Sequence, residues 1–157
     1  MKEAGGVGGP RIAFLVSRFN SLITEQMLRG ARRRLLERGI TSKAVNVLYV
    51  PGAWDMPQAA RRIADSGRYD AILAIGCVIR GETAHFDYVA GQASDGLGRV
   101  ALTADIPVVF GVLTTDTGEQ AMLRADMHGA NKGGEFADAV LDMLELYASH
   151  PRDANRS

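Results

Sequence analysis

Four short apolar runs, separated by segments with helical periodicity, predict the secondary structure of this chain. The runs cover residues 12–16, 45–50, 71–79 and 108–113. Each run is almost continuously apolar rather than alternating, which is typical of parallel strands that are buried on both faces. We therefore expect a four-stranded parallel sheet covered by helices on both sides.

Helical patterns fill the intervals between these runs. Ile23, Met27, Ala31 and Leu35 recur every four residues, and Gly39 is a suitable end for that helix. Further helices are expected over 56–66, 83–104, 118–125 and 131–148, with a weak point in the second of these at 95–98. Strands that alternate with helices indicate one doubly wound α/β domain. We place it at 11–149, after a flexible segment at 1–10 and before a polar tail at 150–157.

Composition narrows the possible classes of protein. The chain has 157 residues, of which 46% are hydrophobic and 23% are charged, so one globular domain with a real core is expected. Eighteen basic residues balance eighteen acidic ones, so no overall field favours nucleic acid or an anionic membrane. The single cysteine, Cys77, excludes an intrachain disulfide and favours a reducing, cytoplasmic location. No apolar run approaches the roughly 20 residues of a membrane span.

The loops directly after the predicted strands are the candidate site, because doubly wound sheets bind ligands beyond the carboxyl ends of their strands. They cover residues 17–20, 51–57, 80–85 and 114–116. Phe19 and Trp54 lie on adjacent loops of this set, where each ring could fold back over the sheet edge. Two rings at one ligand edge favour the alternative, which is a stacking site for a flat ring.

Phosphate is the second ligand that these loops suggest. Gly81-Glu82-Thr83 lies between a strand and a helix start, which is a favourable place for an anion, although Thr83 could simply cap the helix. His85 follows in the first helical turn and could move protons, although a lone histidine is more often structural. Arg124 is either a solvated charge or a phosphate ligand.

Other motifs are absent or weak. The glycines of GGVGGP precede the first strand, so they are not a dinucleotide fingerprint, and no phosphate-binding P-loop is present. The three histidines and Cys77 lack metal-ligand spacing, so no metal is predicted. The Arg32-Arg33-Arg34 run could touch nucleic acid, but a solvated or interface helix face suits the zero net charge better.

A series of longer motifs resembles one family. The segments SRFN, PGAWDMP, GCVIRGETAHFDYV, PVVFGVLTT, EQAMLRA and NKGGEFA are similar, in order and spacing, to those of the lumazine synthases, from Arg11 to Tyr147. The resemblance implies a flavodoxin-like three-layer sandwich, which an N-terminal strand from a neighbouring subunit could extend. It also implies a cofactor-free transferase that condenses 5-amino-6-(D-ribitylamino)uracil with 3,4-dihydroxy-2-butanone 4-phosphate. Its products would be 6,7-dimethyl-8-ribityllumazine, phosphate and water, in the penultimate step of riboflavin biosynthesis.

The resemblance also implies roles for single residues. His85 would be the proton donor and shuttle. Residues implied to bind phosphate are Glu82, Thr83, Arg124 and Lys132. Residues implied to hold the pyrimidine substrate are Phe19, Ala53, Trp54, Asp55, Cys77, Val78, Ile79 and Phe110. Two positions depart from the family. Asp55 replaces the usual glutamate and is one methylene shorter, so its contact with the ribityl chain would be longer or bridged by water. Trp54 is bulkier than the residue expected there.

Assembly is part of the same resemblance. The family forms pentamers, paired pentamers or icosahedral shells of sixty subunits, and its pocket is shared between two subunits. The absence of an insertion between Arg124 and Asn131 favours the shell, which could enclose riboflavin synthase. Two alternatives remain open from sequence. One is a flavin- or lumazine-binding protein without turnover, and the other is a shell-forming homologue with weak catalysis.

Overall fold

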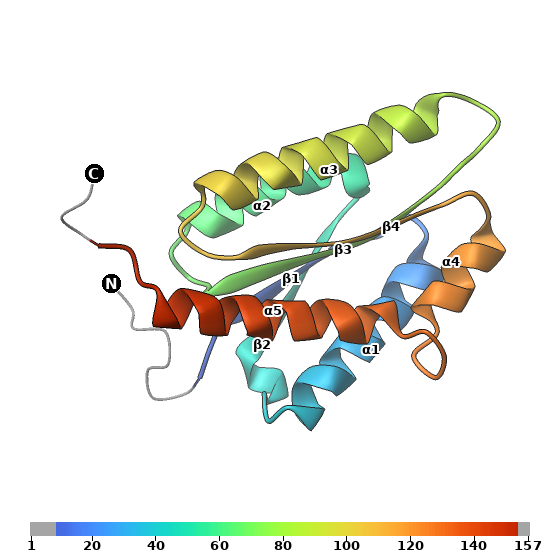
Figure 1. Ribbon diagram of the computed structural model, residues 1–157. Coiled ribbons are helices and arrows are strands. Elements are labelled where there is room, and N and C mark those ends of the chain that lie inside the picture. Colours follow the sequence, from blue (N-terminus) through green and yellow to red (C-terminus); the bar gives the residue numbers. More distant parts are fainter. Residues whose placement is uncertain (1–8, 154–157) are drawn as a thin grey trace.

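A four-stranded parallel sheet lies between two layers of helices in the computed structural model, which describes residues 9–153 (Figure 1). The strands, in the spatial order β2-β1-β3-β4, are β1 (Ile12–Ser17), β2 (Val45–Val50), β3 (Ala71–Ile79) and β4 (Val108–Thr115). The helices are α1 (Ser21–Glu37), α2 (Met56–Asp65), α3 (His85–Thr103), α4 (Gly118–Ala125) and α5 (Lys132–Ser149). Two 3₁₀ turns, η1 (Ser42–Ala44) and η2 (Ala53–Asp55), precede β2 and α2. The predicted flavodoxin-like α/β fold is confirmed.

Each face of the sheet has its own hydrophobic core, which explains why the strands read as continuous apolar runs. Helices α1, α4 and α5 cover one face, and α2 and α3 cover the other (Figure 1). Successive side chains of β1 point to opposite faces: Phe14 belongs to the first core, and Leu15 belongs to the second. Both are at most 1% exposed. A strand that is buried on two sides needs an apolar residue at every position.

The main departures from the predicted elements lie around the third crossover. Helix α3 begins at His85 rather than at Thr83, and it continues unbroken through the predicted weak point at 95–98. Thr83 is not the N-cap residue, which is Ala84, and the side chain of Thr83 makes only a long contact with the His85 N–H. Gly96 is required within this helix, since a Cβ there would lie 2.5 Å from the Pro57 ring. The weak point is therefore a close helix contact between α3 and α2.

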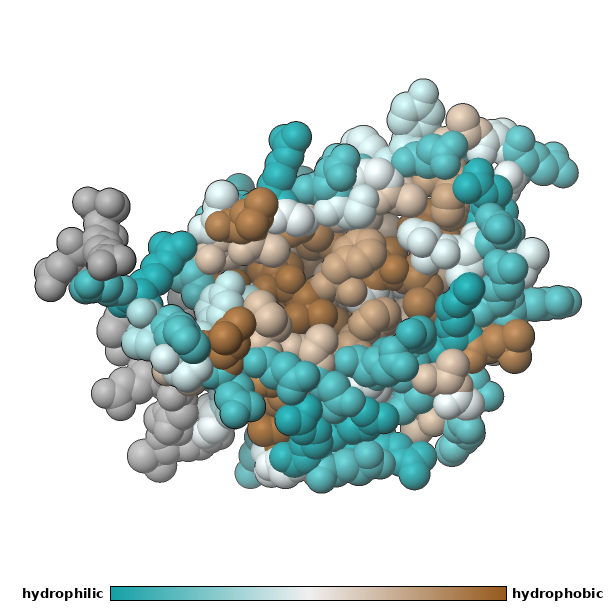
Figure 2. Space-filling view, in the orientation of Figure 1, coloured by the Kyte–Doolittle hydropathy of each residue, from teal (hydrophilic) through white to brown (hydrophobic). Residues whose placement is uncertain are grey.

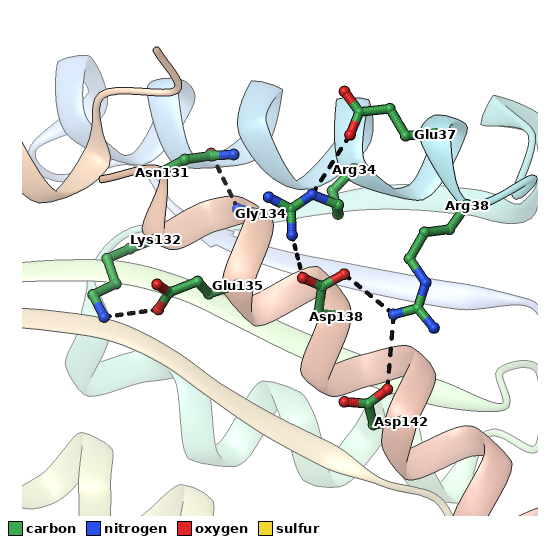
Figure 3. Close-up of polar contacts among 9 residues, drawn as sticks. All are labelled: Arg34, Glu37, Arg38, Asn131, Lys132, Gly134, Glu135, Asp138 and Asp142. Carbon is green, nitrogen blue, oxygen red and sulfur yellow. Dashed lines mark hydrogen bonds and ion pairs between the residues drawn. The ribbon is translucent and has the colours of Figure 1, made fainter. Parts of the chain in front are cut away.

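Helices α1 and α5 pack very closely, and polar contacts join them along their length (Figure 3). Arg34 of α1 and Arg38, which directly follows that helix, both form ion pairs with Asp138 of α5. Asn131 adopts a left-handed backbone conformation at φ 47°, and its side-chain oxygen accepts the Gly134 N–H at 3.2 Å. The start of α5, with its NKGG segment, lies against the middle of α1, since a Cβ built on Gly133 would overlap the backbone of Met27.

The ends of the chain remain open as predictions. The segment expected to be flexible, 1–10, falls mostly outside the described residues, as does the second half of the tail at 150–157. The added strand from a neighbouring subunit would come from the same N-terminal segment.

Candidate active site

The carboxyl ends of β1, β2 and β3 meet at one edge of the sheet, and the loops that follow them carry most of the predicted site residues. Phe19 follows β1, Trp54 follows β2, and residues 81–85 follow β3. Because β1 lies between β2 and β3, this edge includes the point where the strand order reverses. Ligands of doubly wound sheets bind at that point.

The two predicted stacking rings are both accessible. Phe19 is 73% exposed and Trp54 is 50% exposed, so neither ring is folded away beneath the sheet edge. The backbone N–H of Phe19 donates to the carbonyl of Pro51 at 3.1 Å, which joins the first loop to the second. The two loops therefore present aromatic surface from a shared backbone framework.

Asp55 has a structural contact of its own. Its Oδ2 accepts the backbone N–H of Gly52 at 3.1 Å, which closes the η2 turn beside the buried Ala53. The other oxygen, Oδ1, has no hydrogen-bond partner within the described range 9–153. One carboxylate oxygen thus shapes the loop, and the second remains able to accept a hydrogen bond from a ligand hydroxyl.

The end of β3 contributes backbone rather than side chains. The side chains of Cys77 and Val78 are buried, at 3% and 8% exposure, one in each core. Burial raises the pKa of the Cys77 thiol to about 11, so the thiol is protonated near neutral pH. The backbone carbonyl of Cys77 accepts a hydrogen bond from the side-chain amide of Asn20 at 2.9 Å. Ile79, the last strand residue, is partly buried against the first core.

The segment after β3 is open on its surface side. Residues 81–85, which include Glu82, Thr83 and His85, are all exposed. The single side-chain bond within this segment is long, from the His85 backbone N–H to Thr83 Oγ1 at 3.4 Å. The first turn of α3 therefore keeps backbone donors that can meet an anion, and the imidazole of His85 lies beside them.

The remaining predicted residues form a second group on other elements. Phe110 is 41% exposed and lies midway along the edge strand β4, opposite Ala74 of β3, rather than at the carboxyl end. Arg124 is exposed near the end of α4, and no ion pair or hydrogen bond of its guanidinium occurs among residues 9–153. Lys132 begins α5, where its Nζ lies 2.7 Å from Glu135 Oε2 (Figure 3).

Over residues 9–153, neither of the two principal hollows of the surface joins these two groups. A cavity of about 830 Å³ lies beside the edge, between the start of α1 and α4, but the predicted site residues do not line it. Its lining includes Leu22, Ile23, Met122 and Leu123.

Comparison with known proteins decides the family. The family model described as 6,7-dimethyl-8-ribityllumazine synthase matches residues 9–148. The chain belongs to this family. A lumazine synthase is a transferase of riboflavin synthesis, so the exposed aromatic rings and the anion-suited segment lie on an enzyme scaffold. The match also includes both groups of site residues, those at the carboxyl edge and those on β4, α4 and α5.

Within residues 9–153, no three side chains of histidine, cysteine, aspartate or glutamate are grouped so that they could hold a metal ion. None of the helices described there is both long enough and apolar enough to cross a bilayer.

Sequence reasoning missed the roles of three residues that lie in its candidate loops and that shape this edge of the sheet. Asn20 has a positive φ of 62° and ties the first loop to β3, and an asparagine just before a helix was the available signal. Arg80 and Asp116 join the third loop to the fourth through a 3.0 Å contact. No local pattern marks that pair, because the two residues are far apart in the chain.

Proposed function

We propose that this chain is a 6,7-dimethyl-8-ribityllumazine synthase. It condenses 5-amino-6-(D-ribitylamino)uracil with 3,4-dihydroxy-2-butanone 4-phosphate in the penultimate step of riboflavin synthesis, in the cytoplasm. The observation that carries the proposal is the gathering of exposed Phe19, exposed Trp54 and the segment 81–85 at one sheet edge, in a chain whose family match runs over 9–148. An aromatic ring and a phosphate are the two features that the substrates present.

The proposed chemistry needs proton transfer and a held leaving group. The substrate amine attacks the ketone carbon, and loss of water gives an imine. Phosphate is then eliminated, and ring closure of the second amine onto the remaining carbonyl, with loss of a second water, yields the lumazine. His85 moves protons in these steps, while Thr83, the backbone after β3 and Arg124 bind the phosphate. Glu82 contributes through its backbone N–H, because its carboxylate would repel the anion.

Phe19, Trp54 and Asp55 hold the pyrimidine and its ribityl chain in this proposal. Ala53 and the backbone of 77–79 form the wall behind the ring. The free oxygen of Asp55 accepts a ribityl hydroxyl. Holding the two substrates in contact supplies a large part of the acceleration, up to roughly 7–11 kcal/mol in well-oriented cases.

A neighbouring subunit completes the pocket. Phe110, Arg124 and Lys132 lie apart from the carboxyl-edge loops, so we propose that they serve the site of the adjacent copy. The surface supports this arrangement, since a broad apolar area covers β4 between α3 and α5 (Figure 2). Exposed apolar side chains of these elements include Leu102, Phe110, Leu146 and Tyr147. An unpaired edge strand with apolar flanks is typical of a protein interface.

The proposed assembly is a homopentamer, further assembled into an icosahedral shell. The turn between α4 and α5 is short, and Asp126 closes it by accepting the N–H groups of His128 and Gly129 at 3.0 Å each. Sedimentation of the purified protein tests the assembly. A pentamer as the sole species would refute the shell, and an active monomer would refute the shared pocket. Co-sedimentation of added riboflavin synthase tests whether that enzyme is a partner.

A turnover assay tests the proposed reaction. Purified protein is mixed with both substrates, and lumazine absorbance and released phosphate are followed together. We expect equal amounts of both products, formed faster than without protein. A folded, oligomeric protein that gives no acceleration would refute the synthase and favour a lumazine-binding or shell-forming homologue.

A further inference from the structure

The guanidinium of Arg80 connects three segments around the proposed phosphate-binding loop. Its Nε lies 3.0 Å from Asp116 Oδ1, in the segment between β4 and α4. Its Nη1 lies 3.8 Å from Asp87 Oδ1, in the first turn of α3. Its Cζ lies 4.5 Å from the centre of the Phe86 ring, which packs partly against the second core. One side chain therefore reaches the start of α3 and the neighbouring loop at once.

These contacts hold both ends of the segment 81–85. At its first end, the backbone N–H of Arg80 donates to the Thr115 carbonyl at 2.8 Å, which extends the pairing of β3 with β4 by one residue. At its second end, the Arg80 side chain contacts Phe86 and Asp87. The segment itself is exposed and has the one long side-chain bond to Thr83, so its own contacts fix it poorly.

Arginine is suited to this task because its planar group can stack on a ring while its edge binds carboxylates. Each contact alone is weak, since the Arg80, Asp87 and Asp116 side chains are half-exposed or more. Their joint effect is on geometry, because all three act on the same rigid group. Lysine could keep one carboxylate contact, but its ammonium group could not bind both carboxylates while lying flat on the Phe86 ring.

We propose that Arg80 is a positioning residue that sets the distance between the phosphate-binding backbone at 81–83 and the imidazole of His85. The inference rests on the proposed function of this edge. Because Arg80 holds the two ends of the segment, Thr83 and His85 stay at the spacing that lets both contact the same substrate molecule. Loss of the guanidinium leaves every proposed binding group present but lets them move relative to one another.

The rival explanation is that Arg80 binds the substrate phosphate directly. The two explanations predict opposite effects for Asp116→Asn. If Arg80 positions the loop, removing its carboxylate partner loosens the segment and raises the KM for the butanone phosphate. If Arg80 binds phosphate, removing a competing carboxylate leaves more positive charge for the substrate and lowers that KM.

The experiment compares Arg80→Met, Arg80→Lys and Asp116→Asn with the wild type. Arg61→Met is the matched control, because Arg61 also pairs with an aspartate, Asp65 at 3.3 Å, but lies on α2. Steady-state kinetics give kcat and the KM for each substrate. Hydrogen exchange of the backbone amides at 81–86 is measured without substrate, so it reports on the loop whether or not the protein turns over.

We expect Arg80→Met to lower kcat/KM for the butanone phosphate roughly 10- to 100-fold, through both constants, because small displacements of reacting groups are costly. Arg80→Lys should recover part of this loss, and Asp116→Asn should raise KM by less than about tenfold. Exchange at 81–86 should accelerate in Arg80→Met and not in Arg61→Met.

Three results would overturn the inference. They are a lowered KM in Asp116→Asn, kinetics of Arg80→Met that equal those of Arg61→Met, and exchange at 81–86 that is already at the unstructured rate in the wild type. A wild type without turnover would instead refute the proposed function, while the exchange comparison would still decide whether Arg80 holds the loop.

Discussion

Replacing Gly133 with alanine should destabilise the protein, because this glycine lets the backbones of α5 and α1 touch. Gly133 is buried in the first turn of α5. A Cβ built there would overlap the carbonyl oxygen of Met27 and lie 2.8 Å from its carbonyl carbon. Ordinary carbon–carbon contacts are about 3.5–4.0 Å, so the helices would have to separate by roughly an ångström.

The neighbouring atoms belong to backbone, so no side-chain rotation can relieve the contact. Separation would also loosen the packing of Met27, Ala31, Ala137 and Val140, which are all fully buried. Overpacking of this kind costs about 3 kcal/mol at the upper part of its usual range. Alanine regains up to ~1 kcal/mol through its better helix propensity. The free energy of unfolding should therefore fall by about 2 kcal/mol.

Gly98→Ala is the matched control. Gly98 lies inside α3 on an exposed surface, and no atom lies within 4 Å of a Cβ built there. The same change should therefore stabilise the protein by up to ~1 kcal/mol through helix propensity alone. The two variants should differ by about 3 kcal/mol, which corresponds to roughly 6–12 °C in Tm for a domain of this size.

Thermal and urea unfolding, at equal protein concentrations, measure both effects. Circular dichroism reports the helices, and the midpoint of each variant is compared with the wild type. A Gly133→Ala variant that unfolds at or above the wild-type midpoint would refute the close backbone contact. Destabilisation by Gly98→Ala would show that helix propensity and the space around the Cβ do not determine the stability change at these two positions.

Four further predictions concern the proposed site and the buried thiol. His85→Ala should lower kcat roughly 10²–10⁴-fold without abolishing turnover, and complete loss in a folded variant would contradict this range. Arg124→Ala should mainly raise the KM for the butanone phosphate, about 10- to 100-fold for a lost charged hydrogen bond, and an unchanged KM would exclude Arg124 from the phosphate site. Cys77 should react slowly with iodoacetamide at pH 8 and much faster in urea, because burial raises its pKa to about 11; equal rates would contradict the burial. The unfolded thiol ionises near its ordinary pKa of 9.0, so its contribution to the free energy of unfolding should fall between about pH 9 and 11.

Prediction from sequence succeeded where a local pattern carried the information. The predicted and observed bounds agree for β2 and β3, and β1 and β4 begin at the expected residues. Continuous apolar runs required burial on both faces, and two helical layers provide it. Gly39 and Gly67 follow α1 and α2 with positive φ values, as expected for helix ends.

The edge that carries the proposed site was also predictable, because strand–helix alternation makes the sheet parallel and gathers the loops after its strands. The start of α3 was not. Thr83 resembles an N-cap in sequence, but the helix begins two residues later, at His85. Arg80, just before this segment, contacts Asp116 and Asp87 in the first turn of α3. Such contacts depend on which loops are neighbours in space.

Residue types and their periodicity, read along the chain, determined the layers, the strand runs and the edge where we propose the site of this member of the lumazine synthase family. Tertiary structure alone decided how closely α1 and α5 approach at Gly133, and which carboxylates Arg80 meets. It also decided the separation of Phe110 on β4 from the loops that carry Phe19 and His85. The physical reason is range: periodicity and propensity act over a few neighbouring residues, whereas these contacts join residues that only the packing of the helices and the order of the strands bring together.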